Sequence, residues 1–109
     1  ALQGPFLIVA PLSCVGNWVR EAKRFVPHLS VAKLCGSAHE KKRALDDDEL
    51  WFGLKDIVIT TYETTVGTED FLQQHFWSAL VLDEAHRIKN ESSSIREALD
   101  AVKCASRVL

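Results

Sequence analysis

Several marks of specialised protein classes are missing from this chain of 109 residues. The three cysteines, Cys14, Cys35 and Cys104, include no CxxC pair, which argues against a zinc site or a disulfide framework and favours a reducing, intracellular compartment. No apolar run reaches transmembrane length and no signal-peptide pattern opens the chain, so we expect no membrane partner. The net charge of −2 provides no global basic field, so any contact with nucleic acid has to come from local patches.

The residues that are present predict one small α/β domain. A hydrophobic share of 47% is enough to form a core, and no repeat, low-complexity stretch or linker divides the chain. Apolar, β-branched runs alternate with helical patterns, which predicts a parallel sheet with helices on both faces. The strands are expected at 6–10, 31–35, 56–61 and 79–82, with another beginning at 107–109.

Helices are expected between these strands because apolar residues recur at three- and four-residue steps. The first runs from about Val15 to Pro27, with Ser13 as its N-cap. A capping-box pattern at 37–40 opens a polar helix that extends toward Trp51, and a second one at 94–97 opens a final helix that ends near Lys103. Shorter helical segments are expected at 62–67 and 69–75.

The most informative segment is the apolar strand 79–82, which runs directly into Asp83 and Glu84. It would carry both acids to the carboxyl end of the sheet, where open α/β sheets bind their ligands. Asp83 would hold Mg²⁺, through water, and Glu84 would orient or deprotonate an attacking water in a phosphoryl transfer. His86, beside them, would sense a γ-phosphate or couple to a nucleic-acid contact. The simpler alternative is that Asp83 caps a helix that starts near Ala85.

Two other strand ends carry groups that can contact a phosphate. Pro11 and Ser13 stand where a strand meets a helix N-terminus, and free amides there can bind a phosphate of a nucleic-acid strand. Thr60, Thr61 and Tyr62 place three hydroxyls at the end of the next strand. Taken alone, an ordinary turn and cap explains the first place better, and threonines also simply suit strands.

Together these segments resemble the first RecA-like lobe of the Swi/Snf family of ATP-dependent DNA translocases, in helicase superfamily two. Residues 4–13 with Asn17 and Trp18 resemble motif Ia, and residues 35–37 with 56–63 resemble motif Ib. Residues 83–90 match motif II, of the DEAH type, and the ending from Arg87 to Asn90 separates it from RNA-processing DEAH helicases. The resemblance covers nearly the whole chain and is strongest for remodelers of the imitation-switch and chromodomain-helicase types.

The resemblance implies a nuclear DNA-dependent ATPase that moves along duplex DNA and repositions nucleosomes, together with a second RecA-like lobe. Its cofactors would be ATP and Mg²⁺. Motif II coordinates them in the family, which implies catalytic and nucleotide-binding roles for Asp83 and Glu84, the metal for Asp83, and a place in the nucleotide site for His86. Motifs Ia and Ib contact the backbone of one DNA strand, which implies DNA binding by five residues: Pro11, Ser13, Thr60, Thr61 and Tyr62.

Two parts of the family pattern do not occur in residues 1–109, namely the Gly-x-x-x-x-Gly-Lys-Thr phosphate-binding loop (Walker A) and motif III. The resemblance therefore implies a partial helicase ATP-binding domain. An arginine finger from the second lobe is worth ~10³–10⁵ in rate, so we expect these residues alone to be inactive, and their unpaired strand edges to favour aggregation. Two alternatives stay open: a non-catalytic module that binds DNA or a protein, and a lobe of a DEAH-type RNA helicase.

Overall fold

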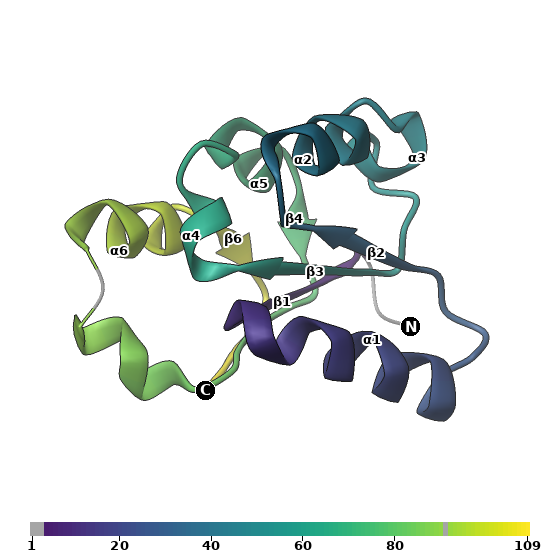
Figure 1. Cartoon of the computed structure of the whole chain (residues 1–109), viewed down its shortest axis with the longest axis horizontal. Helices are drawn as coiled ribbons and strands as arrows, with labels where there is room; N and C mark the ends of the chain where they lie inside the picture. Colours follow the sequence, from purple (N-terminus) through teal and green to yellow (C-terminus); the bar gives the residue numbers. More distant parts are fainter. Residues whose placement is uncertain (1–3, 91) are drawn as a thin grey trace.

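The computed structural model of the chain describes residues 4–90 and 92–109. Within this part, five parallel strands form one sheet in the order β2-β3-β1-β5-β7 (Figure 1). Their bounds are Phe6–Ala10 for β1, Val31–Leu34 for β2, Ile57–Thr61 for β3, Ala79–Leu82 for β5 and Arg107–Val108 for β7. The predicted parallel sheet is confirmed, and β1 is its central strand.

The strand register brings the carboxyl ends of three strands together. Val9 of β1 pairs with Thr60 of β3 on one side and with Leu82 of β5 on the other. The residues that follow these strands therefore begin at the same edge of the sheet. We call this edge, formed by the carboxyl ends of β1, β3 and β5, the site edge.

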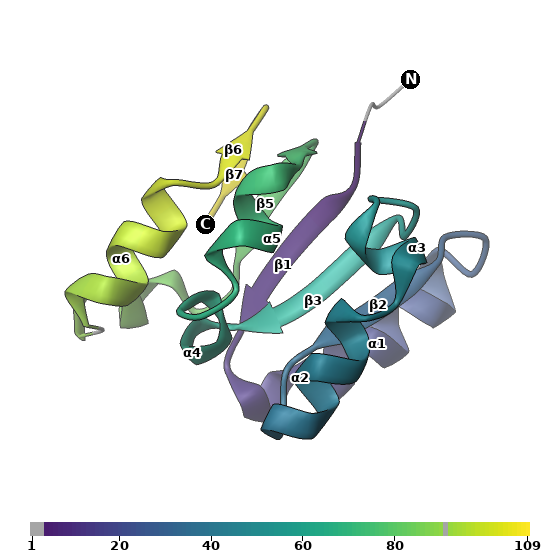
Figure 2. The same cartoon turned by 90° about the horizontal axis from the view of Figure 1, so that it is seen from above.

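Helices cover both faces of the sheet, as predicted. Their bounds are Leu12–Phe25 for α1, Ala38–Leu45 for α2, Asp48–Trp51 for α3, Tyr62–Thr65 for α4, Glu69–Gln74 for α5 and Ser93–Asp100 for α6, and a 3₁₀ helix, η1, covers Ala85–Asn90. Figures 1 and 2 show α1 on one face and α2 to α6 on the other. None of the described helices combines the length and apolar character needed to cross a bilayer.

Alternation along the strands supplies each face with its own core, because neighbouring side chains of a strand point to opposite sides. On the α1 face, Ile8 and Ile59 pack with Val15 of that helix. On the other face, Leu7 and Leu80 belong to a larger cluster that includes side chains from the remaining helices. The central strands β1, β3 and β5 are therefore largely buried on both faces, which explains why they read as nearly continuous apolar runs.

Two predicted helix caps are wrong. The N-cap of α1 is Pro11, with φ −59°, and Ser13 lies inside the first turn. Proline suits this place because its ring fixes φ and because a helix start needs no N–H donor there. The N-cap of α6 is Ser92, whose Oγ accepts a hydrogen bond from the Ile95 amide at 3.3 Å, so the predicted capping box at Ser94 is also wrong.

The long polar helix expected between Ser37 and Trp51 is two helices. The capping box that opens it is confirmed, with Ser37 Oγ accepting from the Glu40 amide and the Ser37 amide donating to Glu40 Oε1, both at 3.1 Å. The helix then ends at Leu45, and α3 starts anew after Asp47, whose carboxylate accepts from the Glu49 amide at 2.9 Å. Aspartate interrupts a helix here because its short side chain satisfies backbone amides in place of the helix itself.

A separate pair of very short parallel strands was not predicted. Phe76–Trp77 (β4) pairs with Lys103–Cys104 (β6), and the final helix ends at Asp100 rather than near Lys103. Two-residue strands leave no alternation to detect in a sequence. Trp77 is fully buried within this part of the fold.

Candidate functional site

The acid pair leaves β5 at the site edge. The Asp83 amide donates to the Val9 carbonyl oxygen at 2.9 Å, so Asp83 is still attached to the central strand. Glu84 then has φ 52°, in the left-handed region that a residue with a Cβ rarely adopts, before η1 begins at Ala85. This turn separates the two carboxylates: Asp83 is half-buried, whereas Glu84 is exposed. Strained backbone of this kind is a recurrent feature of functional sites.

Asp83 is held in place by two further elements. Trp18 Nε1 of α1 donates to Asp83 Oδ2 at 2.9 Å, and the Tyr62 hydroxyl of α4 donates to the Asp83 carbonyl oxygen at 2.7 Å. Within the described residues the Asp83 side chain accepts from Trp18 and from no amide of η1, so the alternative of a simple helix cap loses support. The sequence placed Trp18 only in the segment that resembles motif Ia, so its contact with Asp83 is found from the structure alone.

Glu84 lies between a thiol and an imidazole. Cys14 Sγ donates to Glu84 Oε2 at 3.7 Å, and His86 Nε2 lies 4.0 Å from Glu84 Oε1. The structure thus brings together Asp83, Glu84 and His86, the three residues predicted for the nucleotide site, and adds Cys14. The side chains of Arg87, Lys89 and Asn90 lie outside the part that the structure describes.

The acid pair offers the donor atoms that Mg²⁺ prefers. Asp83 Oδ2 is occupied by Trp18, while Oδ1 receives no hydrogen bond within the described part of the chain. Mg²⁺ binds through one or two carboxylates and keeps several waters, which requires an open, partly solvated place such as this one. The residues present therefore fit a hydrated Mg²⁺ ion.

The beginning of α1 forms another part of the site edge. Pro11 is buried, and Ser13 is exposed in the first turn of the helix. Among the described residues no side chain caps this helix of 14 residues; the Cys14 amide donates to the Pro11 carbonyl oxygen at 2.8 Å, so the amides of Leu12 and Ser13 are the ones available at the edge. Amides at a helix N-terminus bind anions such as phosphate.

The three predicted hydroxyls at the end of β3 lie at the same edge, but they are buried. Thr60, Thr61 and Tyr62 are 0%, 3% and 1% exposed. Thr60 Oγ1 donates to the Leu34 carbonyl oxygen at 2.6 Å, Thr61 Oγ1 lies 2.7 Å from Thr64 Oγ1, and Tyr62 binds Asp83 as described above. Their hydroxyls are thus committed to contacts inside the protein.

A hollow of about 260 Å³ joins these parts of the site edge. It is lined by the first residue of α1, the turn after β2, one lysine of α2 and the start of α4: Leu12, Gly36, Lys41, Thr61, Glu63 and Thr64. Lys41 belongs to the polar helix that the sequence predicts after the capping box at 37–40. Lys41 reaches this hollow because β2, β3 and β1 are neighbours in the sheet. The sequence alone does not predict this strand order.

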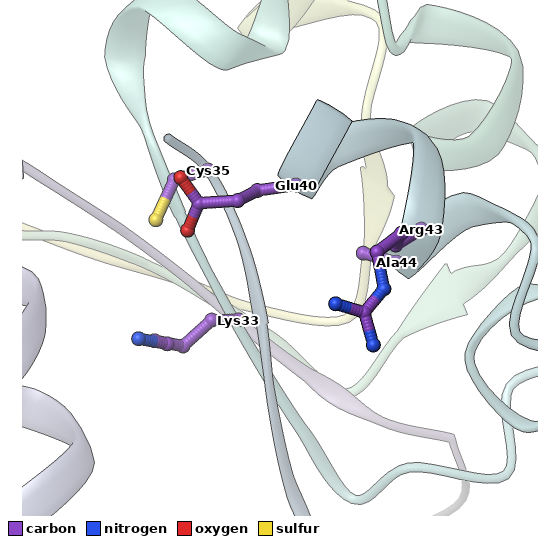
Figure 3. A pocket seen from close by; sticks show the side chains of 5 residues that line it. All are labelled: Lys33, Cys35, Glu40, Arg43 and Ala44. Carbon is purple, nitrogen blue, oxygen red and sulfur yellow. The ribbon is translucent and has the colours of Figure 1, made fainter. Parts of the chain in front are cut away.

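A second hollow, of about 410 Å³, lies away from the acid pair, between β2 and α2 (Figure 3). The amide of Ser37 donates a hydrogen bond to the Glu40 carboxylate, and the Ser37 hydroxyl also interacts with it. Both contacts favour the ionised form and so hold the pKa of Glu40 below its usual value. Burial raises the pKa of the Cys35 thiol, and the nearby Lys33 only partly opposes this. A capping carboxylate and a protonated thiol form no catalytic constellation, so we assign no reaction to this hollow.

Comparisons with known proteins agree with this geometry. The family model of the SNF2-related domain matches residues 2–109 of this chain. The mouse chromodomain-helicase-DNA-binding protein 1-like is 38% identical over 107 residues, and the human SWI/SNF-related matrix-associated actin-dependent regulator of chromatin subfamily A member 1 is 36% identical over 108 residues. These alignments cover 98% and 99% of this chain but only 12% and 10% of the relatives, so the chain spans about a tenth of their length.

A solved structure shows the same fold. The SWI2/SNF2 ATPase core of Sulfolobus solfataricus, in complex with double-stranded DNA, superposes with a TM-score of 0.74 at 31% identity. The match covers 98% of this chain and 20% of that core. It confirms the predicted RecA-like sheet and the family resemblance. The chain belongs to the SNF2-related domain family.

Proposed function

We propose that residues 1–109 form part of the first RecA-like lobe of a nuclear ATPase that uses ATP and Mg²⁺ to move along duplex DNA and remodel nucleosomes, together with a second lobe. The relatives support this proposal, since their names include a chromodomain-helicase-DNA-binding protein and chromatin-remodeling ATPases. The observation that carries it is the acid pair at the site edge, with Asp83 held by α1 and α4 and Glu84 turned outward.

The two acids have different tasks in this proposal. Asp83, with Oδ2 fixed by Trp18, would hold a hydrated Mg²⁺ through its other carboxylate oxygen. Glu84, exposed and displaced by the left-handed turn, orients the attacking water and accepts its proton. His86, 4.0 Å from Glu84, completes the nucleotide side of the site. Mg²⁺, when bound, neutralises charge on the phosphate oxygens.

The beginning of α1 and the hollow beside it form the DNA side of the proposed site. We propose that Ser13 and the free amides behind Pro11 contact one phosphate, because an uncapped helix start attracts anions. Thr60, Thr61 and Tyr62 contribute by shaping this edge through their buried hydrogen bonds. Their committed hydroxyls favour this role over direct contact with the phosphate.

Hydrogen bonds from two helices to Asp83 provide a physical link between the DNA side and the nucleotide side of the proposed site. Trp18 belongs to α1 and Tyr62 belongs to α4, and both end on Asp83. A shift of either helix against the sheet therefore changes the position of the metal-holding carboxylate. Dependence of hydrolysis on DNA follows from this connection.

Ser13→Asp tests the DNA side of the proposal. A carboxylate at the second position of α1 repels the phosphate, and we expect the affinity of the protein for duplex DNA at low salt to fall about tenfold, which corresponds to roughly 1.4 kcal/mol. Helix stability should not suffer, because an acid near a helix N-terminus is favourable. Fluorescence anisotropy with a labelled duplex measures the effect.

Ser94→Asp is the matched control. Ser94 is exposed and also occupies the second position of its helix, α6, so the substitution adds the same charge in the same local setting away from the site edge. We expect its affinity for DNA to match that of the unchanged protein. Equal loss of binding in both variants would reduce the effect to net charge and contradict a contact at Ser13.

A further inference from the structure

The acid pair has a thiol beside it that the proposed ATPase does not use. The ligand atoms of Cys14, Asp83 and Glu84 all lie within 4.8 Å of one another. Cys14 and Glu84 are 70 positions apart in the sequence, so no short sequence motif predicts this cluster. Among the residues that the structure describes, Cys35 and Cys104 belong to no comparable group of metal-binding side chains.

We propose that Cys14, Asp83 and Glu84 bind a thiophilic divalent cation, of which Zn²⁺ is the physiological representative. Mg²⁺ prefers oxygen ligands to sulfur and would be held by the carboxylates alone. A thiolate with two carboxylates is instead a donor set for zinc, which accepts both sulfur and oxygen and commonly takes three protein ligands and one water. The site is thus distinct in its chemistry from the Mg²⁺ site, although it shares two of its residues.

The distances suit a zinc ion. Bond lengths of about 2.3 Å to sulfur and 2.0 Å to oxygen place these two atoms about 3.5 Å apart around a tetrahedral ion. Cys14 Sγ and Glu84 Oε2 are 3.7 Å apart. Small side-chain rotations therefore complete the site, since the Asp83 oxygen already lies within 4.8 Å of the other two atoms.

Neighbouring side chains leave the required atoms free. Trp18 donates to Oδ2 of Asp83, which fixes the plane of the carboxylate and leaves lone pairs of the carboxylate for the ion. His86 faces Oε1 of Glu84, while Oε2 faces Cys14. When the ion binds, the thiol proton that now points to Oε2 passes to solvent and a metal–sulfur bond replaces it. The exposure of Glu84 leaves the fourth position to water.

A zinc ion in this place would keep Asp83 and Glu84 from Mg²⁺ and the attacking water, and so inhibit hydrolysis. This consequence rests on the proposed function, whereas the binding itself does not. The test therefore measures binding directly and needs neither ATP nor DNA.

Cobalt(II) serves as a spectroscopic substitute for zinc, because a cobalt–thiolate bond gives a charge-transfer absorption in the near ultraviolet. We expect this absorption in the unchanged chain, in Cys35→Ser and in Cys104→Ser, even with Mg²⁺ in excess. It should vanish in Cys14→Ser, and Glu84→Gln should weaken cobalt binding by at least about tenfold. An absorption that persists in Cys14→Ser would overturn the proposal.

Alkylation mapped by mass spectrometry gives a second readout that needs no variant. Zn²⁺ should slow the alkylation of Cys14 and leave the rates at Cys35 and Cys104 unchanged. Adding a chelator should restore the rate at Cys14. Equal rates at Cys14 with and without Zn²⁺, or equal protection of all three thiols, would contradict a site at Cys14.

Discussion

On the proposed function, we expect Glu84→Gln to lower the rate of ATP hydrolysis by about 10²–10⁴, the usual contribution of a positioned general base, while ATP still binds. An amide has the size of the carboxylate but cannot accept a proton from the attacking water. Asp83 is untouched by this change, because its contacts run to Trp18, Tyr62 and Val9 rather than to Glu84. The measurement is the steady-state ATPase activity of the intact protein, alongside its nucleotide binding.

Two other variants separate the roles of the acids. Glu97→Gln changes an exposed glutamate of α6 in the same way and should leave hydrolysis unchanged. Asp83→Asn removes the charge that we propose holds the metal, so it should weaken the binding of Mg²⁺-ATP as well as hydrolysis. A Glu84→Gln protein that hydrolyses ATP within about a factor of two of the unchanged rate would exclude Glu84 as the base.

Trp77→Ala should lower the free energy of unfolding by about 3–5 kcal/mol, out of roughly 5–15 kcal/mol for a domain. The Trp77 ring is 0% exposed, and its Nε1 donates to the Leu72 carbonyl oxygen at 3.0 Å. Phe71 and His75 contact the ring edge-on, with centroids 6.0 and 5.7 Å away. The substitution therefore leaves both a cavity and an unpaired buried carbonyl. Urea denaturation followed by circular dichroism measures the loss.

Phe52→Ala is the control for this prediction. It removes an aromatic ring that is 64% exposed, so we expect a change of no more than about 0.5 kcal/mol. A Trp77→Ala protein as stable as Phe52→Ala would show that the pair of short strands β4 and β6 contributes little to the core.

The sequence predicts those parts of the structure that depend on residues close together along the chain. The central strands β1 and β5 are apolar on both faces, because helices cover both, and so they appear as unbroken apolar runs. Asp83 and Glu84 follow such a run directly, which places them at a strand end without any knowledge of strand order. The capping box at Ser37 is equally local.

Contacts between distant segments are the parts that could not be predicted. Trp18 and Asp83 meet only because β1 and β5 are neighbours in the sheet and α1 follows β1. The same topology brings Cys14 to Glu84. Burial of the Tyr62 hydroxyl depends on the neighbouring carbonyl of Asp83, which no local pattern reveals. The expectation of aggregation from open strand edges stays a prediction.

The measurement that most directly tests the central claim is the ATPase activity of the intact protein with duplex DNA, with RNA and with no nucleic acid. In the proposed site, the hydrogen bonds from α1 and α4 to Asp83 link the edge that would bind DNA to the acid that would hold the metal, so duplex DNA should stimulate hydrolysis and RNA should not. Stimulation by RNA would identify an RNA helicase lobe instead. DNA binding without any hydrolysis would identify a non-catalytic module, and either result would contradict the account.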